Sequence, residues 1–208
     1  MKYDVVIVAS GKGQRANLGY NKVFYKMKDG RIVLDCSIDL FLNDDDCINV
    51  IVVLNEDDFD QLNNDKVIKV KGGKERKDSV YNGLQKVSSD YVLIHDGARP
   101  FLRRETLDLI KNELIDNDAV CLGHMATNTI KVIEDDYIVK TLDRNNIFEA
   151  ETPQGFKSEL IKDCYEKCDD IVFTDDASLV ESLNYKVKVV LNKYDNPKLT
   201  KEDDFINL

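Results

Sequence analysis

Glycines and basic side chains gather directly after the first apolar run of the chain, in VVIVASGKGQRANLGYNK (5–22). Glycine amides can approach a phosphate closely, and Arg15 and Lys22 would supply the positive charge that a polyphosphate needs. The six residues from Gly11 to Ala16 also fit the spacing G-x-G-x-x-G/A of dinucleotide-binding loops. This stretch therefore predicts a phosphate-binding loop, and its flanking residues must decide which nucleotide it holds.

The residues after this loop disfavour a dinucleotide site. In a Rossmann site the glycines lead straight into a helix N-terminus, whose amides receive the pyrophosphate. Here Asn17, Gly19 and Asn21 follow, which are residues typical of loops. A Walker A loop is excluded, because G-x-x-x-x-G-K-[ST] cannot be placed on this stretch. A long loop that wraps a polyphosphate is the favoured interpretation, and a plain strand-to-helix connection with surface Lys and Arg is the alternative.

Short β-branched runs alternate with segments of helical period through the first 125 residues. Several runs are almost continuously apolar, as in a parallel sheet that is covered on both faces. The predicted strands are 3–8, 48–54, 66–70, 90–96, 118–125 and 185–191, and the predicted helices are 33–42, 76–87, 104–115 and 158–168. This order predicts a doubly wound, mostly parallel α/β fold, with one domain over residues 1–208. Ligands in such folds bind at the carboxyl ends of strands, so we expect the site in the loops after Val8 and Ile94.

A β-hairpin signal interrupts the alternation at 129–143. Two alternating runs, TIKVI and YIVKTL, flank the turn-forming EDD. A hairpin inserted this late is either an extension of the sheet edge or an arm, at about 128–145, that reaches a partner subunit. The residues alone favour neither interpretation.

Length, charge and cysteine usage narrow the function classes. The chain of 208 residues carries 29 Lys and Arg against 39 Asp and Glu, and its net charge of -10 disfavours partners such as nucleic acid or an anionic membrane. Five cysteines without framework spacing indicate reduced thiols in a cytoplasmic protein, and two distant histidines disfavour a Cys/His zinc site. The N-terminus enters a strand directly and no run approaches 18 apolar residues, so we expect no signal peptide and no membrane span.

Seven stretches carry a resemblance to a known family, and they occur in that family's order. They are VASGKGQRANLGYNKVFYKM (8–27), GGKERKDSVYNGL (72–84), HDGARPF (95–101), NTIKV (128–132), LDRNNIFEAETPQGF (142–156), TDDASLVE (174–181) and YDNPKLTKEDD (194–204). Together they resemble the nucleotidyltransferases, specifically the 2-C-methyl-D-erythritol 4-phosphate cytidylyltransferases, over essentially the whole chain. The resemblance implies a Rossmann-like nucleotidyltransferase fold and transfer of CMP from CTP to a small polyol phosphate. The family often has alanine, proline and aspartate where this chain has Ser10, Asn21 and Asn128.

Cytidylyl transfer needs no strong base, because the attacking phosphate is already ionised near neutral pH. The protein must bring two anions together and neutralise charge in the transition state. By resemblance, Arg15 and Lys22 contact the triphosphate, and Lys198 approaches the same phosphate; these three are the predicted catalytic residues. Mg²⁺ or another divalent cation is expected on the phosphate oxygens, with Asp96 as a candidate protein ligand.

The remaining predicted site residues divide between nucleotide and acceptor. The resemblance assigns the cytosine to GGKERKDSV, where glycines allow a close approach and Ser79 offers a hydrogen bond. The predicted CTP-binding residues are Ala9, Ser10, Gly11, Gly13, Gly73, Lys74, Ser79 and Asp96, and the predicted acceptor-binding residues are Arg99, Thr129, Arg144 and Thr152. In the family, Thr129 and Arg144 bind the acceptor across a dimer interface, so a homodimer through the hairpin arm is expected. Asp175 and Asp176 are expected to organise a loop or to cap the helix that contains Ser178.

Three other functions stay open at this point. A ribitol-5-phosphate cytidylyltransferase of teichoic-acid synthesis resembles the same family, but its versions of three motifs usually differ, so LDR (142–144) and TDDASLVE (174–181) favour the erythritol acceptor. A catalytically silent nucleotide-binding or regulatory protein is disfavoured, because the expected basic residues are all present. A Rossmann oxidoreductase would bind NAD(P) and would be indifferent to CTP.

Overall fold

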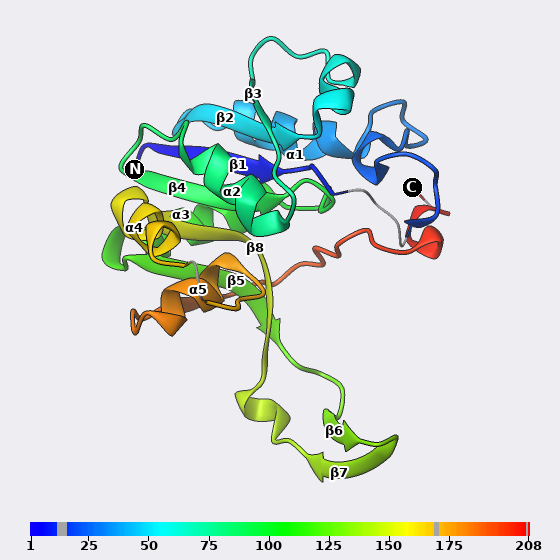
Figure 1. Ribbon diagram of the computed structural model, residues 1–208, viewed down its shortest axis with the longest axis vertical. Helices are drawn as coiled ribbons and strands as arrows, with labels where there is room; N and C mark the ends of the chain where they lie inside the picture. Colours follow the sequence, from blue (N-terminus) through cyan, green and yellow to red (C-terminus); the bar gives the residue numbers. More distant parts are fainter. Residues whose placement is uncertain (12–15, 169–170, 207) are drawn as a thin grey trace.

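The computed structural model describes residues 1–11, 16–168, 171–206 and 208, and its centre is a seven-stranded sheet (Figure 1). The strand order is β3-β2-β1-β4-β8-β5-β9, and only the two pairs that include β8 are antiparallel. The strands are β1 Tyr3–Val8, β2 Cys47–Leu54, β3 Ile68–Lys71, β4 Tyr91–Asp96, β5 Ala119–Met125, β8 Phe148–Lys157 and β9 Lys188–Leu191. The predicted mostly parallel α/β sheet is confirmed.

Helices cover both faces of this sheet. They are α1 Val33–Leu42, α2 Arg76–Leu84, α3 Arg104–Asp116, α4 Ser158–Glu166 and α5 Asp176–Ser182. Short 3₁₀ turns lie in other connections and at the end of the chain, and they are η2 Lys22–Phe24, η3 Glu56–Gln61, η4 Arg144–Asn146 and η5 Glu202–Phe205. Along β1, Val5 and Ile7 pack with α1 and α3, whereas Val6 packs with α2, α4 and α5. This alternation explains why β1 is apolar throughout. In the described part of the chain, no helix is long and apolar enough to cross a membrane.

The strand β8 was not predicted from the sequence. It lies between β4 and β5, and its pairing with β5 slips between Cys121 and Gly123, so that the segment from Glu151 to Pro153 forms a bulge. Proline and glycine inside a run argue against a strand, which is why the sequence of β8 does not read as one. The slip places Thr152 and the cis Thr152–Pro153 bond beside the end of β4.

The predicted hairpin is present as β6 Lys131–Glu134 and β7 Tyr137–Thr141, which pair antiparallel. Asp135 and Asp136 between them have positive φ angles of 46° and 67°, as a two-residue hairpin turn of this kind requires. The hairpin stands at the end of a long excursion from the body between β5 and β8, which we call the arm (127–146) (Figure 1). The predicted strands and helices all occur, with ends shifted by at most three residues.

Candidate active site

A cleft of about 620 Å³ opens at the carboxyl ends of β1 and β4, where parallel sheets of this kind bind ligands. Its walls come from the loop after β1, the start of η2, the loop from β3 to α2, the end of β4 and the segment before η5. The sequence-predicted residues in these walls are Ala9, Ser10, Gly11, Lys22, Gly73, Lys74, Ser79, Asp96 and Lys198. The fold thus brings most of the predicted catalytic and nucleotide-binding residues into one cleft.

Asp96 is the carboxylate around which the cations of the cleft gather. Its side chain ends β4 and is 10% exposed, and Lys198 Nζ lies 2.8 Å from its Oδ2. Arg76 Nε lies 3.4 Å from Oδ1, and Arg99 Nε lies 3.7 Å from Oδ2. Burial alone would raise the pKa of Asp96, but the charges of Arg76 and Lys198 hold that pKa far below its ordinary value. Asp96 is therefore ionised. The three cations around it carry more positive charge than this one carboxylate neutralises, so an anionic ligand can bind beside them.

A buried hydrogen-bond chain fixes the backbone beside Asp96. The Asp96 amide donates to Thr152 Oγ1 at 3.0 Å, and this hydroxyl lies 3.2 Å from Nδ1 of His95, whose Nε2 lies 3.3 Å from the carbonyl oxygen of Arg99. Burial lowers the pKa of His95 to about 4, so the ring is neutral. A neutral ring accepts from Thr152 at Nδ1 and donates to Arg99 from Nε2. Thr152 thus supports the cleft from behind, and its contact with an acceptor stays a prediction.

The segment before η5 brings Lys198 to Asp96. The amide of Leu199 donates to the carbonyl oxygen of Ala98 at 2.9 Å, and Arg99 Nη1 donates to the carbonyl oxygen of Asn196 at 2.6 Å. These bonds lay the C-terminal segment along the loop that follows β4. The position of Lys198 is therefore set by two hydrogen bonds, one from backbone to backbone and one from the Arg99 side chain, with residues about a hundred positions earlier.

The loop from β3 to α2 closes against the end of β1 through glycines and serines. Ser79 Oγ accepts from Ser10 Oγ at 2.8 Å and from the amide of Gly73 at 3.0 Å, and it donates to the carbonyl oxygen of the α2 N-cap residue at 3.1 Å. A Cβ atom on Gly72 would lie 2.5 Å from Cβ of Ser10, so this close approach requires glycine. Ser79 is 1% exposed, and its hydroxyl holds the shape of the wall that Gly73 and Lys74 line. A hydrogen bond from Ser79 to the cytosine base stays a prediction.

Arg76 lines the cleft and was missed by the sequence prediction. Its Nη2 donates at 2.8 Å to the fully buried Asp176 at the start of α5, and the hydroxyl of Tyr165 donates to the same carboxylate at 2.6 Å. Burial alone would lower the pKa of Arg76, but the carboxylates of Asp176 and Asp96 raise it above its ordinary value. Asp175 and Asp176 were predicted to organise a loop or to cap the helix that follows. The cap is Asp175, whose carboxylate accepts from the amide three residues later at 2.9 Å. A charged side chain on the buried face of a helix was the signal that could have pointed to Arg76.

Six predicted residues do not line the described cleft. Two of them, Arg99 and Thr152, lie next to Asp96 without lining the cleft themselves. Gly13 and Arg15 lie outside the residues that the structure describes. Thr129 and Arg144 are exposed on the arm, away from the body, where Arg144 Nη1 donates to the carbonyl oxygen of Thr127 at 2.6 Å (Figure 1). Within one chain, the arm residues predicted to bind the acceptor are therefore separated from the residues predicted to bind CTP.

Comparison with known proteins assigns the whole chain to one group. The family model described as IspD, 2-C-methyl-D-erythritol 4-phosphate cytidylyltransferase, matches residues 3–207. A protein of this name from Halalkalibacterium halodurans is 37% identical over 217 aligned residues, which cover 99% of this chain and 95% of the relative. One from Clostridioides difficile is 38% identical over 214 aligned residues, which cover 97% of this chain and 90% of the relative.

Solved structures agree with these relatives. The 4-diphosphocytidyl-2C-methyl-D-erythritol synthase of Anaerococcus prevotii is 33% identical and superposes with a TM-score of 0.85, covering 99% of this chain and 93% of that chain. The 2-C-methyl-D-erythritol 4-phosphate cytidylyltransferase of Francisella tularensis is 28% identical with a TM-score of 0.86, covering 99% and 97%. The similarity therefore spans the sheet, the cleft and the arm.

Proposed function

The chain belongs to the 2-C-methyl-D-erythritol 4-phosphate cytidylyltransferase family, and we propose that the cleft beside Asp96 is where it carries out its reaction. The enzyme transfers CMP from CTP to 2-C-methyl-D-erythritol 4-phosphate in isoprenoid synthesis, giving 4-diphosphocytidyl-2-C-methyl-D-erythritol and pyrophosphate. The observation that carries the placement is the convergence of Lys22, Arg76 and Lys198 on one cleft at the carboxyl ends of the strands.

In the proposed mechanism, a phosphate oxygen of the acceptor attacks the α-phosphorus of CTP. The new O–P bond forms while the bond from this phosphorus to the pyrophosphate oxygen breaks, so negative charge builds up on the leaving group and on the oxygens around the phosphorus. Lys22 and Lys198 line the cleft, and ammonium groups at these oxygens stabilise the transition state more than the ground state. We assign the same role to Arg15 in the loop after β1.

We propose that CTP lies with its base against the loop from β3 to α2 and its phosphates against the loop after β1. Gly73, Lys74 and Ser79 form the first of these walls, and glycine amides of the second can point at phosphate oxygens. Because phosphate oxygens compete with Asp96 for the same cations, binding of CTP frees an oxygen of this carboxylate.

The donor set of the cleft fits Mg²⁺ that is held mainly by substrate. Mg²⁺ prefers oxygen ligands and is often bound by one or two carboxylates together with phosphates. Asp96 is ionised and lines the cleft, so we propose it as the protein ligand, with the triphosphate supplying the others. Among the described residues, no group of three His, Cys, Asp or Glu side chains could hold the metal by itself. When bound, Mg²⁺ would withdraw negative charge from the phosphate oxygens.

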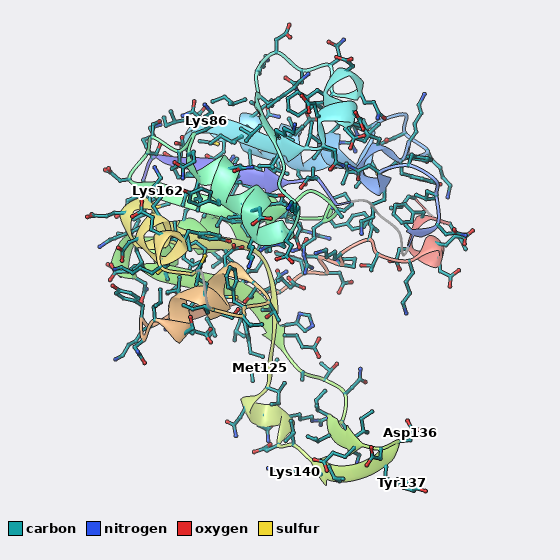
Figure 2. The ribbon with its side chains drawn as sticks, viewed as in Figure 1. Lys86, Met125, Asp136, Tyr137, Lys140 and Lys162 are labelled. Atoms are coloured by element: carbon teal, nitrogen blue, oxygen red, sulfur yellow. The ribbon has the colours of Figure 1, made fainter. Side chains whose placement is uncertain are left out.

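We propose that a second copy of the chain completes the acceptor site. The arm exposes apolar side chains on a two-stranded hairpin, with Ile133 64%, Tyr137 77% and Ile138 64% exposed. Figure 2 shows Asp136, Tyr137 and Lys140 at the end of the arm farthest from the body. An isolated hairpin is marginally stable in water, and an exposed apolar surface of this kind favours a protein partner.

In the homodimer that we propose, the arm of one chain reaches the cleft of the other. Thr129 and Arg144 would then meet Arg99 and Thr152 around the acceptor, and the guanidinium of Arg144 would bind its phosphate. We also propose the cytoplasm as the compartment, because the five cysteines lack framework spacing and are free thiols.

A pyrophosphate-release assay with CTP and Mg²⁺ tests the proposed function. We expect release with 2-C-methyl-D-erythritol 4-phosphate and little with ribitol 5-phosphate. Lys22→Ala and Arg15→Ala should each lower kcat at least about 10²-fold, the scale for losing a group that stabilises transition-state charge. Lys86→Ala is the matched control, because Lys86 is exposed beyond the end of α2 that points away from the cleft (Figure 2). Release with neither acceptor, or near-normal rates in both site variants, would contradict the proposal.

A further inference from the structure

We propose that Asn21 positions Lys22 for the reaction, by tying the start of η2 to the end of β1 and to the buried carboxylate of Asp58. The inference rests on the catalytic role proposed above for Lys22. Asn21 directly precedes Lys22 and is 7% exposed, and Asp58 is 8% exposed. A buried amide against a buried carboxylate is a contact that water does not weaken.

The side chain of Asn21 uses both its hydrogens and its oxygen. Nδ2 donates to the carbonyl oxygen of Ala9 at 2.7 Å and to Asp58 Oδ2 at 2.9 Å. Oδ1 accepts from the amide of Val23 at 3.4 Å and so caps η2. One side chain therefore joins three segments, which are the end of β1, the turn η3 and the turn η2 that carries Lys22.

Asp58 is itself held in place, so it can serve as an anchor. Its carboxylate accepts from Asn21 and Asn55 on Oδ2 and from Gln61 on Oδ1, each at 2.9 Å. Hydrogen bonds to an ionised acceptor are stronger than those between neutral groups. Asn55 directly follows β2, so the anchor is fixed to a second strand of the central sheet.

The place of Lys22 depends on this attachment. A 3₁₀ turn of three residues has little stability of its own, and a lysine side chain is long and flexible. From this turn, Lys22 Nζ reaches the carbonyl oxygen of Leu199 at 2.6 Å, next to Lys198. Burial of Val23 holds the turn against the core, but the directional bonds of Asn21 decide where the turn points. A displacement of about 1 Å at a reacting group can cost about 10²-fold in rate.

Kinetics of Asn21→Ala in two backgrounds test the proposal. In the natural sequence, we expect kcat to fall about 10-fold or more while KM for CTP changes less than about threefold, because a misplaced cation loses transition-state stabilisation in particular. In a chain that already carries Lys22→Ala, we expect the same substitution to lower kcat less than about twofold, because no ammonium remains to be positioned.

Two further variants separate positioning from folding. Gln61→Ala removes a donor to the same carboxylate but is exposed and absent from the cleft wall, so its kcat should stay within about twofold. Asn21→Asp keeps the size and the capping oxygen but sets an acceptor against Asp58, so it should lower kcat at least as far as Asn21→Ala. Circular dichroism, melting temperature and calorimetric CTP binding identify the variants that are folded and still bind CTP.

The outcomes distinguish this inference from the function on which it rests. A natural kcat in folded Asn21→Ala, or an equal loss in both backgrounds, overturns the positioning role alone. A natural kcat in Lys22→Ala overturns the catalytic role of Lys22 and the positioning role together.

Discussion

Arg76→Ala, which separates Arg76 from Asp176, is expected to lower the free energy of unfolding by about 3 kcal/mol. Replacing both residues by alanine is expected to lower it by much less than the sum of the two single losses. The Asp176 side chain is fully buried, and its carboxylate accepts from Arg76 at 2.8 Å and from Tyr165 at 2.6 Å. Arg76→Ala would leave this buried carboxylate with the Tyr165 hydroxyl as its remaining described partner. Removing one member of a buried ion pair typically costs about 3–5 kcal/mol, because the other charge stays buried without compensation.

The expected shift in melting temperature follows from the size of the chain. An unfolding entropy of about 2.1 cal/mol/K per residue over 208 residues gives about 0.4 kcal/mol/K, so about 3 kcal/mol corresponds to about 7 °C. Asp176→Ala should cost less, about 2 kcal/mol, since the Arg76 side chain is 28% exposed and keeps Asp96 at 3.4 Å. The double variant leaves neither charge of this pair buried without its partner. Its loss of free energy of unfolding should therefore be smaller than the sum of the two single losses by about 2 kcal/mol or more.

Urea unfolding followed by circular dichroism, on the natural protein, both single variants and the double variant, measures this coupling. Tyr165→Phe is the matched control, because it removes one hydrogen bond to the carboxylate, worth about 1.5 kcal/mol, and leaves the ion pair intact. Losses that add in the double variant would refute the dependence of each charge on the other. If Arg76→Ala lowers the free energy of unfolding by less than about 0.5 kcal/mol, Asp176 must be in contact with water, which would contradict its complete burial.

Three more predictions concern pH, the cleft wall and the dimer. The pKa of His95 is about 4 in the folded protein and about 6.5 in the unfolded chain. The stability that depends on a neutral His95 is therefore fully present above about pH 6.5 and is lost as the pH falls toward 4. Urea titrations should show a loss of about 3 kcal/mol over this range, and the profile of His95→Asn should be flatter. Gly73→Ala should lower the melting temperature and weaken calorimetric CTP binding, because its Cβ would lie 2.1 Å from a Cβ atom of α2, whereas Gly11→Ala meets nothing within 4 Å and should melt normally. Mixing inactive Arg144→Ala and Lys22→Ala chains should restore part of the pyrophosphate release, and no recovery in confirmed mixed dimers would argue against shared sites.

Local patterns were enough to predict most of the central sheet. The run 3–8 and the helix 33–42 have the predicted bounds, because an apolar strand and a helical repeat are properties of neighbouring residues. The strand β8 escaped prediction because its pairing comes from β4 and β5, whose bonds override the proline and glycine within it. Position 155 in β8 requires glycine, because a Cβ atom there would lie 2.9 Å from side-chain atoms of Leu93 and Val120.

The candidate site could be predicted as a list of residues but not as a set of contacts. Ser79 is predicted to bind the base, which stays a prediction, but the sequence gives no sign that its hydroxyl also bonds Ser10 and Gly73 and holds the wall of the cleft. Arg76 was overlooked because its partner Asp176 lies 100 positions later in the chain. Such pairs follow from the packing of α4 against both α2 and α5, and no periodicity or motif in either segment contains them.

The paired carboxylates also explain how a chain of net charge -10 can bind a triphosphate. At physiological ionic strength, charges beyond about 8 Å are largely screened, so the local cations of the cleft outweigh the acidic surface. Without ligand, the same cations would repel one another in a partly buried space, and Asp96 and Asp176 relieve this repulsion. In the site that we propose, phosphate oxygens would replace contacts of Asp96, while the fully buried Asp176 would still hold Arg76 through its contact of 2.8 Å. The cations would then stay in place while substrate takes over one of their partners, and this is the preorganisation that stabilisation of transition-state charge requires.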